Sequence, residues 1–232
     1  MKRFYTDVSV APHDNHFAIT LDGRAVKTPQ RNALTLPTPE LAEAIAAEWV
    51  AQEEDIDPAT MPLTGLAQGA LDQVKFERDR IVGRIAAFAD SDMLYYRADE
   101  SQQALIDHQA AHWNPLLDWA RSRYDASFNL IHGIIYQAQA EETIERLSNA
   151  VNAQDDFTLA AMLSLVGLSG SLIATLALVE QVHDAGHLWP LVNLEVLWQE
   201  QQWGEDEQAL AARAVKEAEF YAAARFLDLS RT

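Results

Sequence analysis

Two kinds of hydrophobic pattern divide the chain. Between residues 3 and 36, apolar residues alternate with polar ones, as at Phe17, Ile19 and Leu21, and Asp22-Gly23-Arg24 carries a hairpin-turn signal. From residue 38 onward, apolar residues recur every three or four positions, which is typical of amphipathic helices. The pattern predicts an α+β fold, with a small β-rich N-terminal domain followed by a larger all-helical C-terminal domain.

The boundaries of these elements follow from local signals. Thr38 and Pro39 predict the start of one helix within the N-terminal domain, ending near Glu53, and Thr64 predicts the cap of another. The two prolines between residues 55 and 62 place a domain boundary there, giving domains 1–60 and 61–232. Further helices are predicted at 101–113, from Pro115 to 124, at 141–152 and at 205–226, with a β-prone segment at 128–137.

A run without any charged side chain extends from Thr158 to Val179. A helix that is apolar on every side belongs in a protein core or in a membrane. Its serines and glycines dilute the hydrophobicity, and acidic rather than basic residues flank it, so we expect a buried helix and no stable membrane insertion.

The next apolar segment, residues 188–204, carries one carboxylate in its middle, Glu195. At 100° per residue, this side chain shares a helix face with several apolar and amide residues and is flanked by two tryptophans. A carboxylate there either pairs with a buried arginine, is protonated with a raised pKa, or faces another protein. The face consists of Leu188, Leu191, Val192, Glu195, Gln199 and Gln202, with Trp198 and Trp203 beside it.

The net charge, the lack of cysteine and the first residues of the chain each disfavour particular classes of function or location. The chain has 35 acidic and 17 basic residues, a net charge of −18, which disfavours binding to nucleic acid or anionic lipid. With no cysteine, disulfides and thiolate metal sites are excluded. The first residues, MKRFYTDVSV, show neither a signal peptide nor a transit peptide, so we expect a bacterial cytoplasmic protein or the mature form of an imported one.

Candidate catalytic and metal-binding motifs are weak. His108 and His112 are spaced as metal ligands on one helix face, and so are His183 and His187, but Gln109 stands where a zinc protease needs a glutamate. No phosphate-binding glycine loop is present. The competing hypothesis is a small helical enzyme or metal-binding protein that uses Asp92, Tyr96 and Arg97, or the first histidine pair. No cofactor is expected otherwise.

Several segments together resemble the F-type ATP synthase assembly chaperones that act on the α subunit. They are RFYTDVSV, FAITLDGRAVKTP, LPTPELAEAIAAEW, IDPATMPLTGLAQGALD, DSDMLYYRA, HWNPLLDWA, GSLIATLAL and LEVLWQEQQWGEDEQA, and they cover nearly the whole chain in order. The family tends to have a second acidic residue beside the glutamate of the last segment, where this chain has Leu194 and Val196.

The resemblance implies a non-enzymatic chaperone that holds the free α subunit until it meets the β subunit, without a nucleotide of its own. It implies a cytoplasmic location in bacteria and the mitochondrial matrix for eukaryotic relatives, and we expect a monomer. The family's functional glutamate corresponds to Glu195. Either it pairs with a basic residue of the client or it only fixes helix packing. The predicted partner-binding residues are Glu195, Leu191, Trp198, Gln199 and Trp203.

Overall fold

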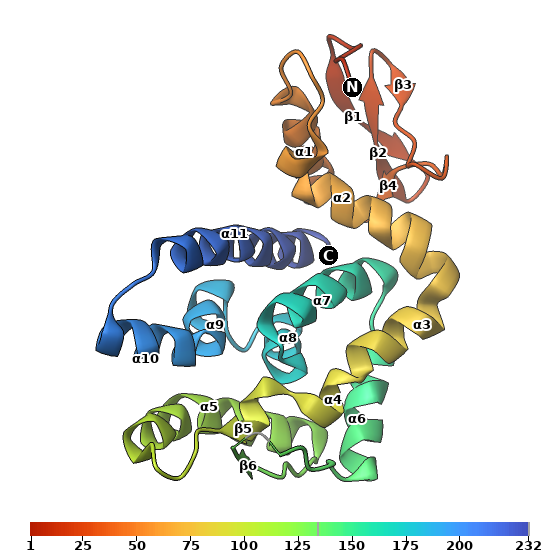
Figure 1. Cartoon of the computed structure of the whole chain (residues 1–232). Coiled ribbons are helices and arrows are strands. Elements are labelled where there is room, and N and C mark those ends of the chain that lie inside the picture. Colours follow the sequence, from red (N-terminus) through yellow and green to blue (C-terminus); the bar gives the residue numbers. More distant parts are fainter. Residues whose placement is uncertain (134, 232) are drawn as a thin grey trace. The chain divides into compact units, whose positions relative to one another are not determined.

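A computed structural model describes residues 1–133 and 135–231. The chain forms two compact units (Figure 1). The first comprises residues 1–78, 155–161 and 222–232, and the second comprises residues 79–154 and 162–221. These units are groups of residues that contact one another, whereas a domain is a part of the chain that folds independently. The domain boundary predicted at residue 60 therefore stays a prediction.

The first unit is built on a small antiparallel sheet. Strand β1 (Val8–His13) pairs with β2 (His16–Leu21) from Val8 opposite Leu21 to His13 opposite His16. Strands β3 (Arg24–Ala25) and β4 (Thr35–Leu36) also pair with β2. The predicted hairpin turn at Asp22-Gly23 is confirmed, because both residues have positive φ between β2 and β3. A second turn, at Asp14 with φ of 52°, joins β1 to β2.

Helix α1 (Pro39–Val50) lies beside this sheet and buries its apolar face (Figure 1). The predicted start is confirmed: Pro39 is in the first turn, and Thr38 caps the helix by accepting the Leu41 N–H at 3.2 Å. Leu41 and Ile45 are fully buried, and Tyr5 donates its hydroxyl to the Trp49 carbonyl at 2.7 Å. The alternating strands and the helix therefore share one small core.

The connection into the helical part differs from the prediction in one respect. Helix α2 (Pro62–Gly69) begins before Thr64, so Thr64 is not its cap. Instead, the Glu48 carboxylate of α1 accepts the Leu63 and Thr64 N–H groups, each at 2.8 Å. A π-helical stretch, Ala70–Val74, then leads into α3 (Lys75–Ala86). The start of α7 (Asp156–Ser169) and the end of α11 (Glu207–Leu229) complete this unit, where Phe157 stacks on Phe226.

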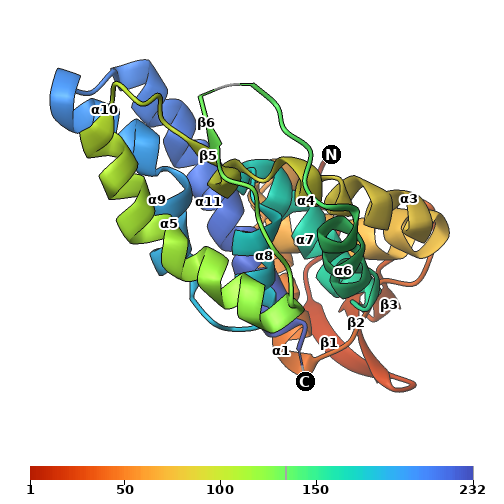
Figure 2. The same ribbon diagram turned by 90° about the horizontal axis from the view of Figure 1, so that it is seen from below.

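The second unit consists almost entirely of helices. They are α4 (Phe88–Ser91), α5 (Gln103–Tyr124), α6 (Glu141–Asn152), α8 (Leu172–Val179), α9 (Ala185–Val192) and α10 (Leu194–Trp203), with most of α3, α7 (Asp156–Ser169) and α11 (Glu207–Leu229). Figure 2 shows α5 running along α8, α9 and α10. A short parallel pair, β5 (Tyr96–Arg97) and β6 (Ile131–His132), is the exception to an all-helical unit among the described residues.

Two helix predictions are corrected by this unit. The predicted break before Pro115 is absent, because α5 continues through that proline as one helix of 22 residues. The apolar run from Thr158 to Val179 is two helices, α7 and α8, separated at Gly170, whose φ of +67° is a conformation that favours glycine. The run is largely buried, as predicted, and among the described residues no helix is long and apolar enough to cross a membrane.

Candidate partner-binding site

The segment that carries Glu195 folds as two helices rather than one. Helix α9 ends at Val192, and Asn193 donates its side-chain amide to the Trp189 carbonyl at 2.8 Å, satisfying a carbonyl near the end of α9. Helix α10 starts at Leu194 and ends at Trp203, and the next residue, Gly204, has a φ of +88°. The single face projected across residues 188–202 is therefore wrong, because the helix axis changes direction at Asn193.

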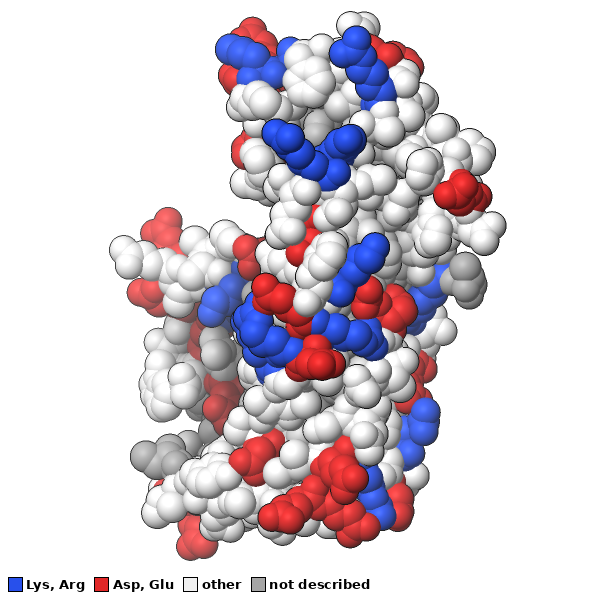
Figure 3. Space-filling view, turned by 90° about the vertical axis from the view of Figure 1, so that its right-hand side faces the viewer, with Lys and Arg blue, Asp and Glu red and all other residues white. Residues whose placement is uncertain are grey.

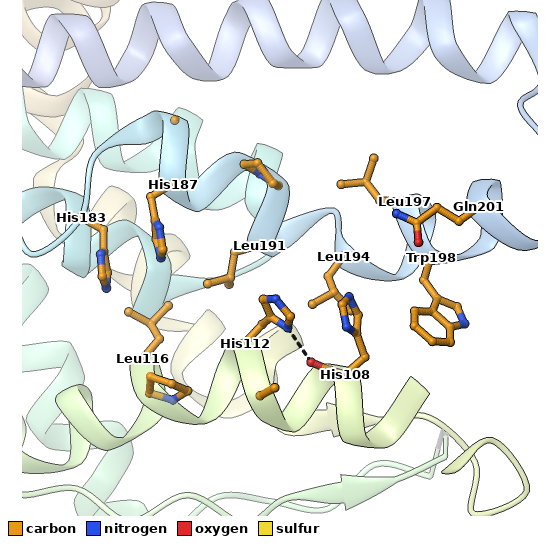
Figure 4. Close-up of a pocket in the computed structure, with 14 residues that line it drawn as sticks. His108, His112, Leu116, His183, His187, Leu191, Leu194, Leu197, Trp198 and Gln201 are labelled. Atoms are coloured by element: carbon orange, nitrogen blue, oxygen red, sulfur yellow. Dashed lines mark hydrogen bonds between the residues drawn. The ribbon is translucent and has the colours of Figure 1, made fainter. Parts of the chain in front are cut away.

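Leu191 and Trp198 line an apolar groove between α5, α9 and α10 (Figure 4). Its volume is about 540 Å³. Leu191 is buried at its base, whereas Trp198 is partly exposed and lies 4.9 Å from the His108 ring, measured between ring centroids. We call this the histidine groove; it is lined by His108, Ala111, His112, Pro115, Leu116, His183, Gly186, His187, Pro190, Leu191, Leu194, Leu197, Trp198 and Gln201.

The two histidine pairs singled out in the sequence both reach this groove. The rings of His108 and His112 lie 4.3 Å apart, and those of His183 and His187 lie 4.2 Å apart. Burial and the neighbouring imidazole lower the pKa of both His108 and His183, which favours the neutral form of these two rings. No cluster of three or more metal-ligating side chains occurs within residues 1–133 and 135–231.

Glu195 lines a different pocket. We call it the charged pocket; its volume is about 760 Å³, and it is lined by Tyr96, Arg97, Ala98, Asp99, Gln102, His132, Gly133, Ile135 and Glu195. The Glu195 carboxylate is held in place by a residue of α5: the Gln109 side chain donates from Nε2 to Oε1 of Glu195 at 2.5 Å. Gln109 is itself fully buried and accepts the Ala98 N–H at 2.9 Å.

Arg97 forms the inner wall of the charged pocket. It is 4% exposed, donates from Nη2 to the Asn114 side chain at 2.8 Å, and lies over the Trp113 ring at 5.1 Å. Burial lowers the pKa of Arg97 to about 10, assisted by the charge of Arg121 and opposed by that of Glu195. An ion pair between Glu195 and a buried arginine was one predicted arrangement. Within the described ranges, Glu195 instead forms a charge-assisted hydrogen bond to an amide.

The remaining two predicted partner-binding residues lie on α10 facing solvent. Gln199 is exposed, and Trp203, the last residue of α10, is 80% exposed. The structure therefore brings Leu191 and Trp198 together in the histidine groove, places Glu195 in the neighbouring charged pocket, and leaves Gln199 and Trp203 on the surface of the same helix.

The residues of the competing enzyme hypothesis do not form one site. Asp92 is fully buried and binds the start of α8: it accepts the Ile173 N–H at 2.9 Å and the Ser171 hydroxyl at 3.0 Å. Burial raises the pKa of Asp92 to about 6, although these hydrogen bonds oppose the shift. Tyr96 and Arg97 line the charged pocket, which Asp92 does not reach.

Sequence reasoning missed Gln109 as a site residue. In the sequence it stands out only where a zinc protease needs a glutamate, yet its position carries a signal. Gln109 lies four residues after Leu105 and four before Trp113, on the buried face of α5. A polar side chain on such a face needs a hydrogen-bond partner, and here the partner is the functional candidate, Glu195.

An apolar groove, a positioned carboxylate in the neighbouring pocket and a highly exposed tryptophan are features typical of a protein-binding surface. The family model described as ATP12 chaperone protein matches residues 2–121. Mitochondrial Atp12 of Schizosaccharomyces pombe is 27% identical over 224 residues, which span 90% of this chain and 75% of that protein. The chain belongs to the ATP12 family of ATP synthase assembly chaperones.

Solved structures of bacterial relatives agree with this assignment. The crystal structure of Atp12 from Paracoccus denitrificans has a TM-score of 0.93 and 37% identity, covering 99% of this chain and 98% of that one. The Atu1473 protein of Agrobacterium tumefaciens has a TM-score of 0.94 and 35% identity, covering 99% of this chain and 86% of that one. The α+β fold class predicted from the sequence is confirmed by these matches.

Proposed function

We propose that this protein binds the unassembled α subunit of the F-type ATP synthase catalytic sector and prevents its aggregation before it joins the β subunit. The protein acts as a monomer, without a cofactor and without catalysis. Its location is the bacterial cytoplasm, with the mitochondrial matrix as the corresponding place for eukaryotic relatives. Family membership supports a client within ATP synthase assembly, and the surface chemistry of α10 supports a client with exposed apolar surface.

The observation that carries the proposal is the composition of α10 and its surroundings. An unassembled subunit exposes apolar interface surface, and a chaperone that covers it needs apolar contacts surrounded by polar groups. The histidine groove offers such contacts through Leu191 and Trp198, and Trp203 adds an aromatic side chain that is 80% exposed. Aromatic side chains are enriched among the residues that dominate binding energy.

Glu195 supplies specificity to this surface. A carboxylate beside an apolar groove pairs with a basic side chain of the client, and such a pair selects the partner and its orientation more than it adds affinity. If Glu195 only fixed the packing of α10 on α5, its replacement by glutamine would lower the melting temperature and leave client binding intact.

The test is co-expression with the cognate α subunit in the absence of the β subunit. We expect the α subunit to stay in the supernatant after sedimentation and to co-purify with the chaperone. A matched control is expression of the α subunit with an unrelated acidic protein of similar size, since net charge alone also affects solubility. Aggregation of the α subunit to the same extent in both cultures, with none bound, would refute the proposal.

A further inference from the structure

The charged pocket has a charge imbalance that a single basic group would correct. Its charged lining consists of two carboxylates, Asp99 and Glu195, and one guanidinium, Arg97, together with the His132 ring. Hydrogen bonds from Ser101 lower the pKa of Asp99, so this side chain is anionic at neutral pH. With Arg97 offsetting one carboxylate, one negative charge is left over in a pocket of about 760 Å³.

The three charged groups differ in how freely they can meet a ligand. Arg97 is 4% exposed and is held by Asn114 and Trp113, so little of its side chain is accessible to a ligand. Glu195 is partly exposed, and Oε1 is occupied by Gln109. Oε2 has no hydrogen bond within residues 1–133 and 135–231, and Glu195 lines the pocket. One carboxylate oxygen is therefore fixed, and the other is left for a ligand.

We propose that the charged pocket receives one lysine or arginine side chain of the client, and that Gln109 is the positioning residue that aims the Glu195 carboxylate at it. This inference rests on the proposed function and specifies the chemistry of the partner at that site. Asp99, which precedes α5, supplies the pocket with a second carboxylate. The residues adjacent to Glu195 in the sequence, Leu194 and Val196, supply none.

Gln109 is suited to this role by its geometry. A glutamate side chain on a helix surface has several rotamers, and fixing it before the partner arrives removes an entropic cost of binding. Gln109 can fix it because its own amide is held: it is fully buried, and its Oε1 accepts the Ala98 N–H. That second bond sets the orientation of the amide, so that Nε2 is the atom presented to Glu195.

The experiment measures suppression of aggregation. Denatured α subunit is diluted into buffer with increasing chaperone, and light scattering gives the chaperone concentration for half-maximal suppression. We expect Glu195→Gln and Gln109→Met each to raise this concentration by about tenfold. The first substitution removes the charge-assisted contact with the client, and the second removes the hydrogen bond that positions the carboxylate. Glu43→Gln, which removes an exposed carboxylate on α1 in the first compact unit, is the matched control and should leave it unchanged.

A double substitution, Gln109→Glu with Glu195→Gln, separates positioning from packing. It rebuilds an amide–carboxylate hydrogen bond between α5 and α10 but moves the charge out of the pocket. We expect it to regain the melting temperature that Gln109→Met loses, without regaining suppression. If the double substitution restores suppression, or if Gln109→Met leaves it unchanged, the inference is wrong while the proposed function stands. Failure of the unaltered chaperone to suppress aggregation would refute the proposed function and this inference with it.

Discussion

Two carboxylates in this protein bind the starts of helices, Glu48 at α2 and Asp92 at α8. Asp92 shows this most clearly: one oxygen accepts the Leu94 N–H at 3.0 Å, and the other accepts the Ser171 hydroxyl and the Ile173 N–H at the first turn of α8. A fully buried carboxylate is tolerated because it has several donors around it. Asp92 precedes the turn Met93–Tyr95, but its contact with residues 171–173 could not be predicted from the local sequence.

The raised pKa of Asp92 predicts a pH-dependent contribution to stability. Between the ordinary carboxyl pKa of 3.8 and its folded value of about 6, the folded protein binds a proton that the unfolded chain does not. This contribution is therefore complete below pH 3.8 and is lost as pH rises through 6. We expect the free energy of unfolding of the parent protein, minus that of Asp92→Asn, to be higher at pH 5 than at pH 7. Urea unfolding at the two pH values measures both free energies. An equal difference at both pH values would contradict the assignment.

Trp203, unlike the buried Asp92, faces solvent, so we expect its substitution to affect client binding rather than stability. At 80% exposure, its replacement by serine should change the free energy of unfolding by less than about 0.5 kcal/mol. If Trp203 contacts the client, the same substitution weakens aggregation suppression by about tenfold or more. Trp113, which is fully buried, is the matched comparison, since its replacement should lower the melting temperature instead.

At the scale of helices and strands, much could be predicted from the sequence, because local signals determined it. Thr38-Pro39 marks the start of α1, and the amphipathic period gives α6 at Glu141–Asn152 with the predicted bounds. The errors occur where tertiary contacts override local preference. Pro115 reads as a helix start, yet α5 continues through it, and residues 188–204 read as one segment, yet Asn193 divides them into two helices.

The same limit applies to the candidate site. The sequence indicates which residue types are unusual, such as a lone carboxylate in an apolar segment, and so it singles out Glu195. It does not indicate which distant residues meet it. Gln109 is 86 positions away, and Asp99 lies outside any helix, so their convergence with Glu195 depends on the packing of α5 against α10.

The junction between α1 and α2 gives a prediction at this scale. Glu48, which the helical pattern places on the apolar face of α1, accepts the N–H groups of Leu63 and Thr64 and the Thr64 hydroxyl. It thereby caps α2, whose own preceding residue, Met61, offers no side-chain cap. We expect Glu48→Ala to lower the free energy of unfolding by about 1–3 kcal/mol, measured by chemical denaturation. Glu43→Ala, an exposed position on the same helix, is the control and should have little effect.

For the whole molecule, the relevant property is the distribution of its net charge of −18. Figure 3 shows that on one face acidic and basic side chains are interleaved across the middle, whereas acidic groups gather at its lower end. Interleaved charges form short-range pairs, such as Arg78 with Asp156 at 2.6 Å, and these cancel at a distance. The excess carboxylates do not cancel, and they produce a field that attracts basic segments of a partner.

This field predicts how salt affects chaperone action. Screening at about 8 Å in physiological salt shortens to about 3 Å at 1 M, so association guided by long-range attraction slows as salt is added, whereas apolar contacts do not weaken. We expect the rate of α-subunit capture, followed by stopped-flow light scattering, to fall as NaCl rises from 0.05 to 0.5 M. Glu195→Gln should show a weaker salt dependence of affinity, because the pair it removes is electrostatic. A capture rate that does not change with salt would mean that apolar contacts on α9 and α10 alone bring the client to the surface.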